Sequence, residues 1–171
     1  LWIALGSLFV VAAALFWAGY EQAGSSLNLF AERFTDRMVG GFEIPAGWFQ
    51  APSALYILIF APMFSALWIW LGRRNLDPSA PVKFALGLIA NAFGFLVLMW
   101  ALKSMVFEFG GAQLIPFWPL AACYVVQTVG ELCLSPIGLS MVTKLAPAHM
   151  VGATMGAWFM SISLGNKLAG N

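Results

Sequence analysis

The sequence predicts an all-α fold, a polytopic bundle of transmembrane helices, and three observations support this prediction. Apolar residues make up 61% of the 171 residues, 9% are charged, and the mean hydropathy is +0.87. An ordinary soluble domain carries roughly 25% charged residues. The apolar residues are grouped in long stretches, and the connections between these stretches hold most of the charges. The chain is therefore expected to lie in a lipid bilayer.

Five apolar stretches are long enough to cross a bilayer, since a helix needs about 20 apolar residues for a hydrocarbon core of roughly 30 Å. We expect spans at 1–31, 46–71, 82–102, 114–143 and 149–171. Arg73 and Arg74 lie between the second and third spans and Lys83 at the start of the third, and Lys144 lies between the fourth and fifth spans with His149 at the start of the fifth. Positively charged connections tend to face the cytoplasm, so both connections are predicted to lie on that side.

Proline and glycine interrupt the expected spans unusually often. The interruptions are Gly24 in the first span, Pro52 and Pro62 in the second, and Pro116, Pro119 and Pro136 in the fourth. We therefore expect kinked or broken helices, whose freed backbone groups must face protein or a watery cavity. The pair Gly152 and Gly156, four residues apart, permits close approach of another helix to the fifth span.

Two acidic residues, Glu21 and Glu131, stand alone in strongly apolar stretches. Each belongs to a polar stripe at helical spacing, made by Trp17, Glu21, Ser25 and Asn28 in the first span and by Gln127, Glu131, Ser135 and Gly138 in the fourth. An ionised carboxylate at the bilayer centre costs at least ~2.5 kcal/mol, so it needs a cation, a proton or water. A functional role is the preferred interpretation, and a purely structural ion pair is the alternative.

Several function classes are excluded by composition. A net charge of +1 and the absence of a basic run argue against a nucleic-acid partner. The single His149 leaves no Ser and His pair at membrane depth, and no metal-ligand cluster or phosphate-binding loop exists, so the chain is not expected to be an enzyme or to hold a metal. Cys123 and Cys133 lie in an apolar helical stretch and are expected to pack rather than form a disulfide.

Six short segments of the chain match the motifs of one known family. FWAGYEQAGSSLNLFA at 16–31 resembles the seventh transmembrane helix of the proton-dependent oligopeptide transporter family, which belongs to the major facilitator superfamily, and GELCLSPIGLS at 130–140, followed by KLAP at 144–147, resembles the tenth. GAWF at 156–159 and GNKLAG at 165–170 are similar to the eleventh helix, and PVKFALG at 81–87 to the entrance of the ninth. The resemblance covers nearly the whole chain.

The resemblance implies a transporter of twelve helices in two six-helix halves, with residues 1–171 forming part of the C-terminal half, helices seven to eleven. It further implies import of di- and tripeptides by alternating access, with the proton as coupling ion and no other cofactor. Short connections favour a multi-pass protein of a bacterial inner membrane. The expected partners are the peptide, the lipid bilayer and the N-terminal half of the same protein.

The resemblance also suggests roles for individual residues. Glu21 would be a proton-responsive gate paired with an arginine of the first helix, and Glu131 would lie near the amino terminus of the bound peptide and a lysine of the fourth. Trp17, Trp158 and Ser135 would line the substrate cavity. Ser53 stands where the family usually has an asparagine that clamps the peptide, and a hydroxyl cannot reproduce the paired hydrogen bonds of an amide.

Two other functions stay open at this point. The unusual Ser53 is compatible with a proton-coupled transporter of another small zwitterion or anion. The two carboxylates would also suit a membrane scaffold subunit, in which they only pair with a partner helix and function is insensitive to pH.

Overall fold

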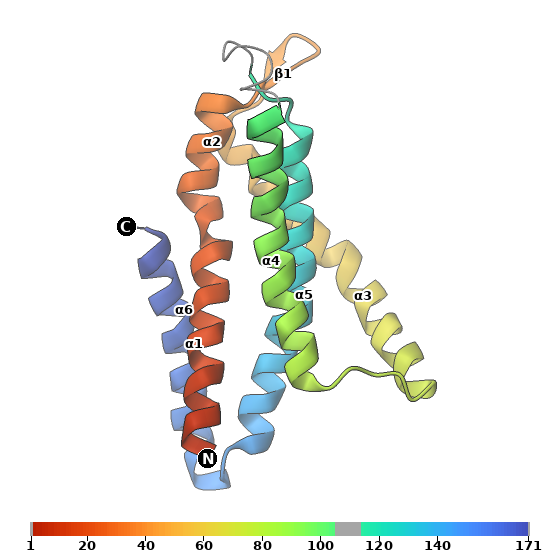
Figure 1. Ribbon diagram of the computed structural model, residues 1–171, viewed down its shortest axis with the longest axis vertical. Helices are drawn as coiled ribbons and strands as arrows, with labels where there is room; N and C mark the ends of the chain where they lie inside the picture. Colours follow the sequence, from red (N-terminus) through yellow and green to blue (C-terminus); the bar gives the residue numbers. More distant parts are fainter. Residues whose placement is uncertain (1, 105–113, 171) are drawn as a thin grey trace.

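The computed structural model describes residues 2–104 and 114–170, which form an elongated bundle of helices (Figure 1). Leu1 and Asn171, the ends of the first and fifth expected spans, lie outside the described residues. The helices are α1 (Trp2–Tyr20), α2 (Ser26–Phe34), α3 (Ala51–Arg73), α4 (Ala80–Leu102), α5 (Trp118–Leu145) and α6 (Val151–Ala169), with short 3-10 turns η1 (Glu21–Gly24), η2 (Ala46–Phe49) and η4 (Ala148–Met150). The all-α prediction is confirmed.

Among the described residues, three segments are long and apolar enough to cross a membrane, Ala46–Arg73, Ala80–Leu102 and Trp118–Lys144. The connection from α3 to α4 and the connection from α5 to α6 lie toward the same end of the bundle, opposite the end where α2 leads into a small hairpin (Figure 1). These two connections carry the positive charges from which the sequence predicts the orientation. Their common location agrees with the orientation expected from the sequence.

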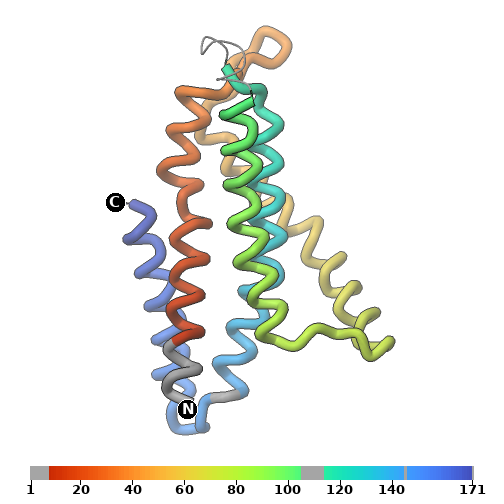
Figure 2. The backbone as a smooth tube through the Cα atoms, viewed as in Figure 1, coloured from red at the N-terminus to blue at the C-terminus, as the bar shows by residue number. Residues whose placement is uncertain are grey.

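Helices α4 and α5 run side by side along most of their length (Figure 2). Their backbones touch at Gly87 and Gly130, where a Cβ atom added to either glycine would lie 2.8 Å from the carbonyl oxygen of the other. On the other flank, α6 packs on α1, and Gly165 lies against the Cβ of Trp17 and the backbone of Ala14. Close approach without a side chain is therefore what joins these helix pairs.

The close approach that Gly152 and Gly156 permit does not occur within the described part of the chain. A Cβ added to either residue would meet no described atom within 4 Å. The contact of α6 with α1 lies further along the helix, at Gly165. Four-residue spacing of small residues permits a contact without requiring one.

The buried side chains form two clusters that together run through the bundle. One joins α1, α4, α5 and α6 and contains Ala13, Phe16, Trp17, Phe84, Leu134 and Trp158. The other joins α2, η2, α4 and α5 and contains Leu27, Ala31, Phe49, Leu98, Leu120, Cys123 and Tyr124. Cys123 and Cys133 are both free and buried, as expected of packing residues.

Helix α3 leans away from this packed bundle (Figures 1 and 2). It starts beside α2 and α5, and none of its residues is buried in the described structure. Where α3 leads into α4, the ammonium group of Lys83 lies 2.7 Å from the Asp77 carboxylate and 4.5 Å from the centre of the Trp68 ring. Lys83, which the sequence groups with the positive charges of this connection, is therefore a buried residue of α4.

A short hairpin follows α2, with β1 (Met38–Val39) paired antiparallel to β2 (Phe42–Glu43). Gly40 and Gly41 form its turn with φ of 61° and 85°, a conformation that glycine adopts without strain. The sequence analysis did not predict these strands, because two residues are too few to give an alternating pattern.

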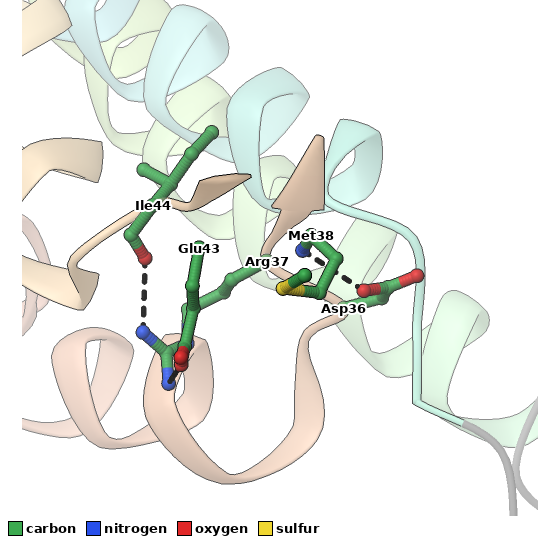
Figure 3. Close-up of polar contacts among 5 residues, drawn as sticks. All are labelled: Asp36, Arg37, Met38, Glu43 and Ile44. Carbon is green, nitrogen blue, oxygen red and sulfur yellow. Dashed lines mark hydrogen bonds and ion pairs between the residues drawn. The ribbon is translucent and has the colours of Figure 1, made fainter. Parts of the chain in front are cut away.

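Polar contacts hold the base of this hairpin (Figure 3). Arg37 donates to the Ile44 carbonyl at 2.9 Å and forms an ion pair with Glu43, while the backbone N–H of Met38 donates to the Asp36 carboxylate at 3.0 Å. These charges lie at the end of the bundle that the orientation assigns to the outside, where water is available to solvate them.

Candidate functional site

The helical path of the first expected span is interrupted at Glu21. Helix α1 ends at Tyr20, the 3-10 turn Glu21–Gly24 follows, and α2 starts at Ser26. At the junction, Ser25 donates from its hydroxyl to the Ala169 carbonyl at 2.9 Å, near the end of α6. The break predicted from Gly24 is therefore present, and the Ser25 hydroxyl at this break satisfies a backbone carbonyl at the end of α6.

The break places Glu21 near the second carboxylate. The Tyr20 hydroxyl lies beside the Glu131 carboxyl on α5, and Glu21 is close enough to both to interact electrostatically. Glu131 Oε2 is buried and has no hydrogen-bond partner among the described residues. The ion pairs of the described residues are Arg37 with Glu43 and Lys83 with Asp77, so neither carboxylate has a described cationic partner.

A cavity of about 180 Å³ lies next to Tyr20, where α1, the start of α3 and α5 meet. Its lining residues are Tyr20, Ala23, Gln50, Ser53, Tyr124 and Gln127. The Tyr124 hydroxyl and the Gln127 Oε1 atom are buried without hydrogen-bond partners among the described residues. The cavity therefore combines an apolar frame with a few polar groups that are free to bind a ligand, as small-molecule sites do.

Behind the cavity, two amide side chains form a buried chain of hydrogen bonds across three helices. Asn91 of α4 donates from Nδ2 to the Phe16 carbonyl of α1 at 2.9 Å. Gln127 of α5 donates from Nε2 to Asn91 Oδ1 at 3.1 Å. Asn91 is 5% exposed and Gln127 is 1% exposed, so these hydrogen bonds are shielded from water and orient both amides.

The expected site residues fall into two groups. Ser53 lines the cavity, Glu21 and Glu131 lie near Tyr20 at its edge, and Ser135 lies one turn beyond Glu131 with a buried hydroxyl that has no described partner. In contrast, the structure places Trp17 and Trp158 in a hydrophobic cluster and not in the cavity lining. The Trp158 ring fills the space left by Gly138 of α5, which is a packing contact.

Sequence reasoning missed Tyr20, Gln50, Tyr124 and Asn91. The first three line the cavity, and Asn91 orients Gln127. Asn91 carried a usable signal, because it is the only Asn, Gln or charged side chain in the apolar stretch 84–102. A lone amide at membrane depth needs hydrogen-bond partners in the same way as a lone carboxylate does.

A second cavity, of about 300 Å³, lies at the opposite end of α5. It is lined by Asp77, Pro78, Ser79, Ala80, Lys83, Ile137, Ser140, Met141 and Lys144. Lys83 is already paired with Asp77 there. This cavity contains none of the site residues expected from the sequence.

Comparison with known proteins identifies the relatives of this arrangement. The family model of the POT family matches residues 4–171. The chain is 48% identical to the peptide transporter YePEPT of Yersinia enterocolitica over 95% of this chain and 32% of that protein, and 34% identical to dipeptide and tripeptide permease A of Proteus mirabilis over 95% and 32%. The chain thus spans about a third of the length of the curated relatives it matches.

A solved structure shares the fold. A crystal structure of a mutant of the peptide transporter POT in complex with alafosfalin superposes with a TM-score of 0.86 at 36% identity, over 96% of this chain and 33% of that one. These relatives are transporters by name, which supports the expectation that the chain is not an enzyme. The chain belongs to the POT family, and its helices form part of a major facilitator fold.

Proposed function

We propose that the protein containing this chain imports di- and tripeptides by alternating access, driven by protons, in a bacterial inner membrane. Relatives named as peptide transporters and as dipeptide and tripeptide permeases support the substrate class. The observation that carries the proposal is the cavity beside Tyr20, because it gathers polar groups without described partners within apolar helices. Tyr20, which lines it, also lies beside two carboxylates that have no cationic partner among the described residues.

The cavity is suited to a small polar ligand. Its polar groups come from three separate segments, the end of α1, the start of α3 and the middle of α5. A relative tilt of these segments would open the cavity or close it, since no covalent connection fixes them at this depth. Binding that favours one of two arrangements is the thermodynamic requirement for alternating access.

Glu21 and Glu131 are the proposed proton-binding groups. Both lie in apolar surroundings, where an ionised carboxylate needs a cation or must take up a proton. Like charges repel, so ionisation of one of two neighbouring carboxyl groups disfavours ionisation of the other. The cationic partners are proposed to be an arginine and a lysine in the part of the protein outside this chain. Protonation of Glu21 would release its partner and allow the outward-open arrangement.

The first experiment measures uptake of labelled dialanine by the full-length protein in liposomes, with and without an inwardly directed proton gradient. We expect the gradient to stimulate uptake by the wild type and not by Glu21→Gln, which cannot exchange a proton. Glu32→Gln, the same substitution at an exposed position of α2, is the matched control and should keep the stimulation. Gradient-driven uptake by Glu21→Gln would show that Glu21 does not couple the proton to transport.

A second candidate substrate class is favoured by one residue. Ser53 lines the cavity with a hydroxyl where the family usually has an amide. A small zwitterion or anion without a peptide bond would need fewer paired hydrogen bonds at this position. Absence of dialanine uptake by folded wild-type protein, with uptake of such a compound, would favour this candidate over peptides.

A further inference from the structure

The orientation of the Asn91 amide is fixed by the backbone of another helix. The Phe16 carbonyl can only accept a hydrogen bond, so Asn91 must turn Nδ2 toward it. This leaves Asn91 Oδ1 pointing to Gln127. The fit is close, because a Cβ atom at Gly19 of α1 would collide with the Asn91 amide. A larger residue at position 19 would displace this amide.

The orientation of Asn91 in turn fixes that of Gln127. Since Asn91 presents an acceptor, Gln127 must present a donor, and its Nε2 lies 3.1 Å from Asn91 Oδ1. The opposite orientation of Gln127 would bring two acceptor oxygens together. Gln127 Oε1 is thus held as a free acceptor, buried and without a described partner.

This free acceptor belongs to a side chain that lines the cavity with Tyr20, Gln50, Ser53 and Tyr124. A buried acceptor without a partner is unfavourable, and a ligand that supplies a donor removes the penalty. A neutral carbonyl matches a neutral N–H group, whereas the ammonium end of a peptide is better matched by a carboxylate such as Glu131. The group that fits Gln127 is therefore the N–H of a peptide bond.

We propose that Gln127 determines specificity by accepting a hydrogen bond from the peptide-bond N–H of the substrate, and that Asn91 is its positioning residue. The inference rests on the proposed peptide transport. It also gives a reason why Ser53 is tolerated, because α5 supplies an amide contact that α3 lacks. Asn91 itself touches no ligand, since its two polar atoms bind Phe16 and Gln127.

The test compares two isomeric substrates, alanyl-alanine and alanyl-sarcosine, the second of which carries an N-methyl group in place of the peptide N–H. KM and maximal rate are measured for full-length protein in liposomes. In the wild type, KM should be lower for alanyl-alanine. Gln127→Met keeps the length of the side chain and removes the acceptor, so KM for alanyl-alanine should rise about tenfold while KM for alanyl-sarcosine changes little.

Asn91→Leu tests the positioning role. It should reduce the preference for alanyl-alanine, and it should have no further effect in a Gln127→Met background, because both changes remove the same contact. The matched control is Thr143→Val on α5, whose hydroxyl binds only the carbonyls of Leu139 and Ser140 in its own helix, and it should leave both KM values unchanged. If Gln127→Met is not recovered as monodisperse protein, Asn91→Leu alone gives the comparison.

The outcomes separate this inference from the proposed function. A preference for alanyl-alanine that persists in folded Gln127→Met would overturn the specificity role of Gln127, and one that persists in folded Asn91→Leu would overturn the positioning role of Asn91. Both outcomes leave peptide transport standing. Wild-type protein that transports neither substrate would overturn the proposed function, and the inference with it.

Discussion

Helices α3 and α5 are both apolar and long enough to cross a bilayer, yet they differ completely in how they pack. Helix α3 buries no residue in the described structure, whereas α5 contacts α3, α4 and α6 and contributes Leu120, Cys123, Gln127, Gly130 and Leu134 to the interior. Helix α5 contains more polar residues and more small residues than α3 does. In these two helices, small and polar residues distinguish the packed helix, while hydropathy alone indicates only that each can enter lipid.

The largest effect is expected where α5 has no side chain. Gly130→Leu should lower the stability by about 3 kcal/mol or more, because the added Cβ would lie 2.8 Å from the Gly87 carbonyl oxygen and α4 and α5 would be forced apart. Gly72→Leu near the end of α3 is the matched control, since no described atom lies within 4 Å of its added Cβ. The measurement is the yield of monodisperse protein and its thermal unfolding in detergent. Equal losses in both variants would remove the distinction between the helices.

An intermediate effect is expected where α3 is tied to the bundle. Lys83 is buried and has Asp77 as its ionic partner, so Asp77→Asn would replace the ion pair by a hydrogen bond to a neutral oxygen and leave the ammonium charge without an opposite charge. Because Asp77 is half-exposed, we expect a loss of about 1 to 2 kcal/mol, between the values for surface and buried pairs. High salt should reduce the difference between wild type and variant.

The corresponding measurement is thermal unfolding of both proteins at low and high salt, with limited proteolysis of the connection from α3 to α4. Asp36→Asn in the exposed hairpin region is a suitable control, because an asparagine oxygen can still accept from the Met38 backbone N–H. An unchanged unfolding temperature for Asp77→Asn would show that this cluster does not hold α3.

The contrast between α3 and α5 also explains which features of the fold can be predicted from the sequence and which cannot. The helices and the break near Gly24 follow from apolar length and from glycine and proline, which are local properties. The two carboxylates are conspicuous because charged groups are rare in an apolar helix. Ser53 is conspicuous only through the resemblance, because it stands where the family usually has an asparagine. The packing partner of each helix was not predictable, because apolar residues suit lipid and protein equally.

The roles of the single residues Asn91 and Trp158 are also not predictable from the sequence, because each depends on a neighbouring helix. Asn91 orients Gln127 only because the Phe16 carbonyl of α1 lies opposite, a relation between residues 75 positions apart in the chain. The resemblance implies that Trp158 lines the substrate cavity, and within the described residues its ring packs over Gly138. An aromatic residue on the inner face of a helix fits both roles, and only the neighbouring helix decides between them.

The smallest effect is expected on the outer face of α3. Leu58 is 74% exposed, and Leu58→Ala should change the stability by less than about 0.5 kcal/mol, because lipid or detergent fills the space that the side chain leaves. Leu134→Ala in α5 is the buried counterpart, at 0% exposure, and should cost about 2 to 5 kcal/mol because it leaves a cavity between helices. Thermal unfolding of both variants in the full-length protein makes the comparison. A loss at Leu58 as large as that at Leu134 would mean that another part of the protein, and not lipid, covers this face of α3, so that α3 is a packed helix like α5.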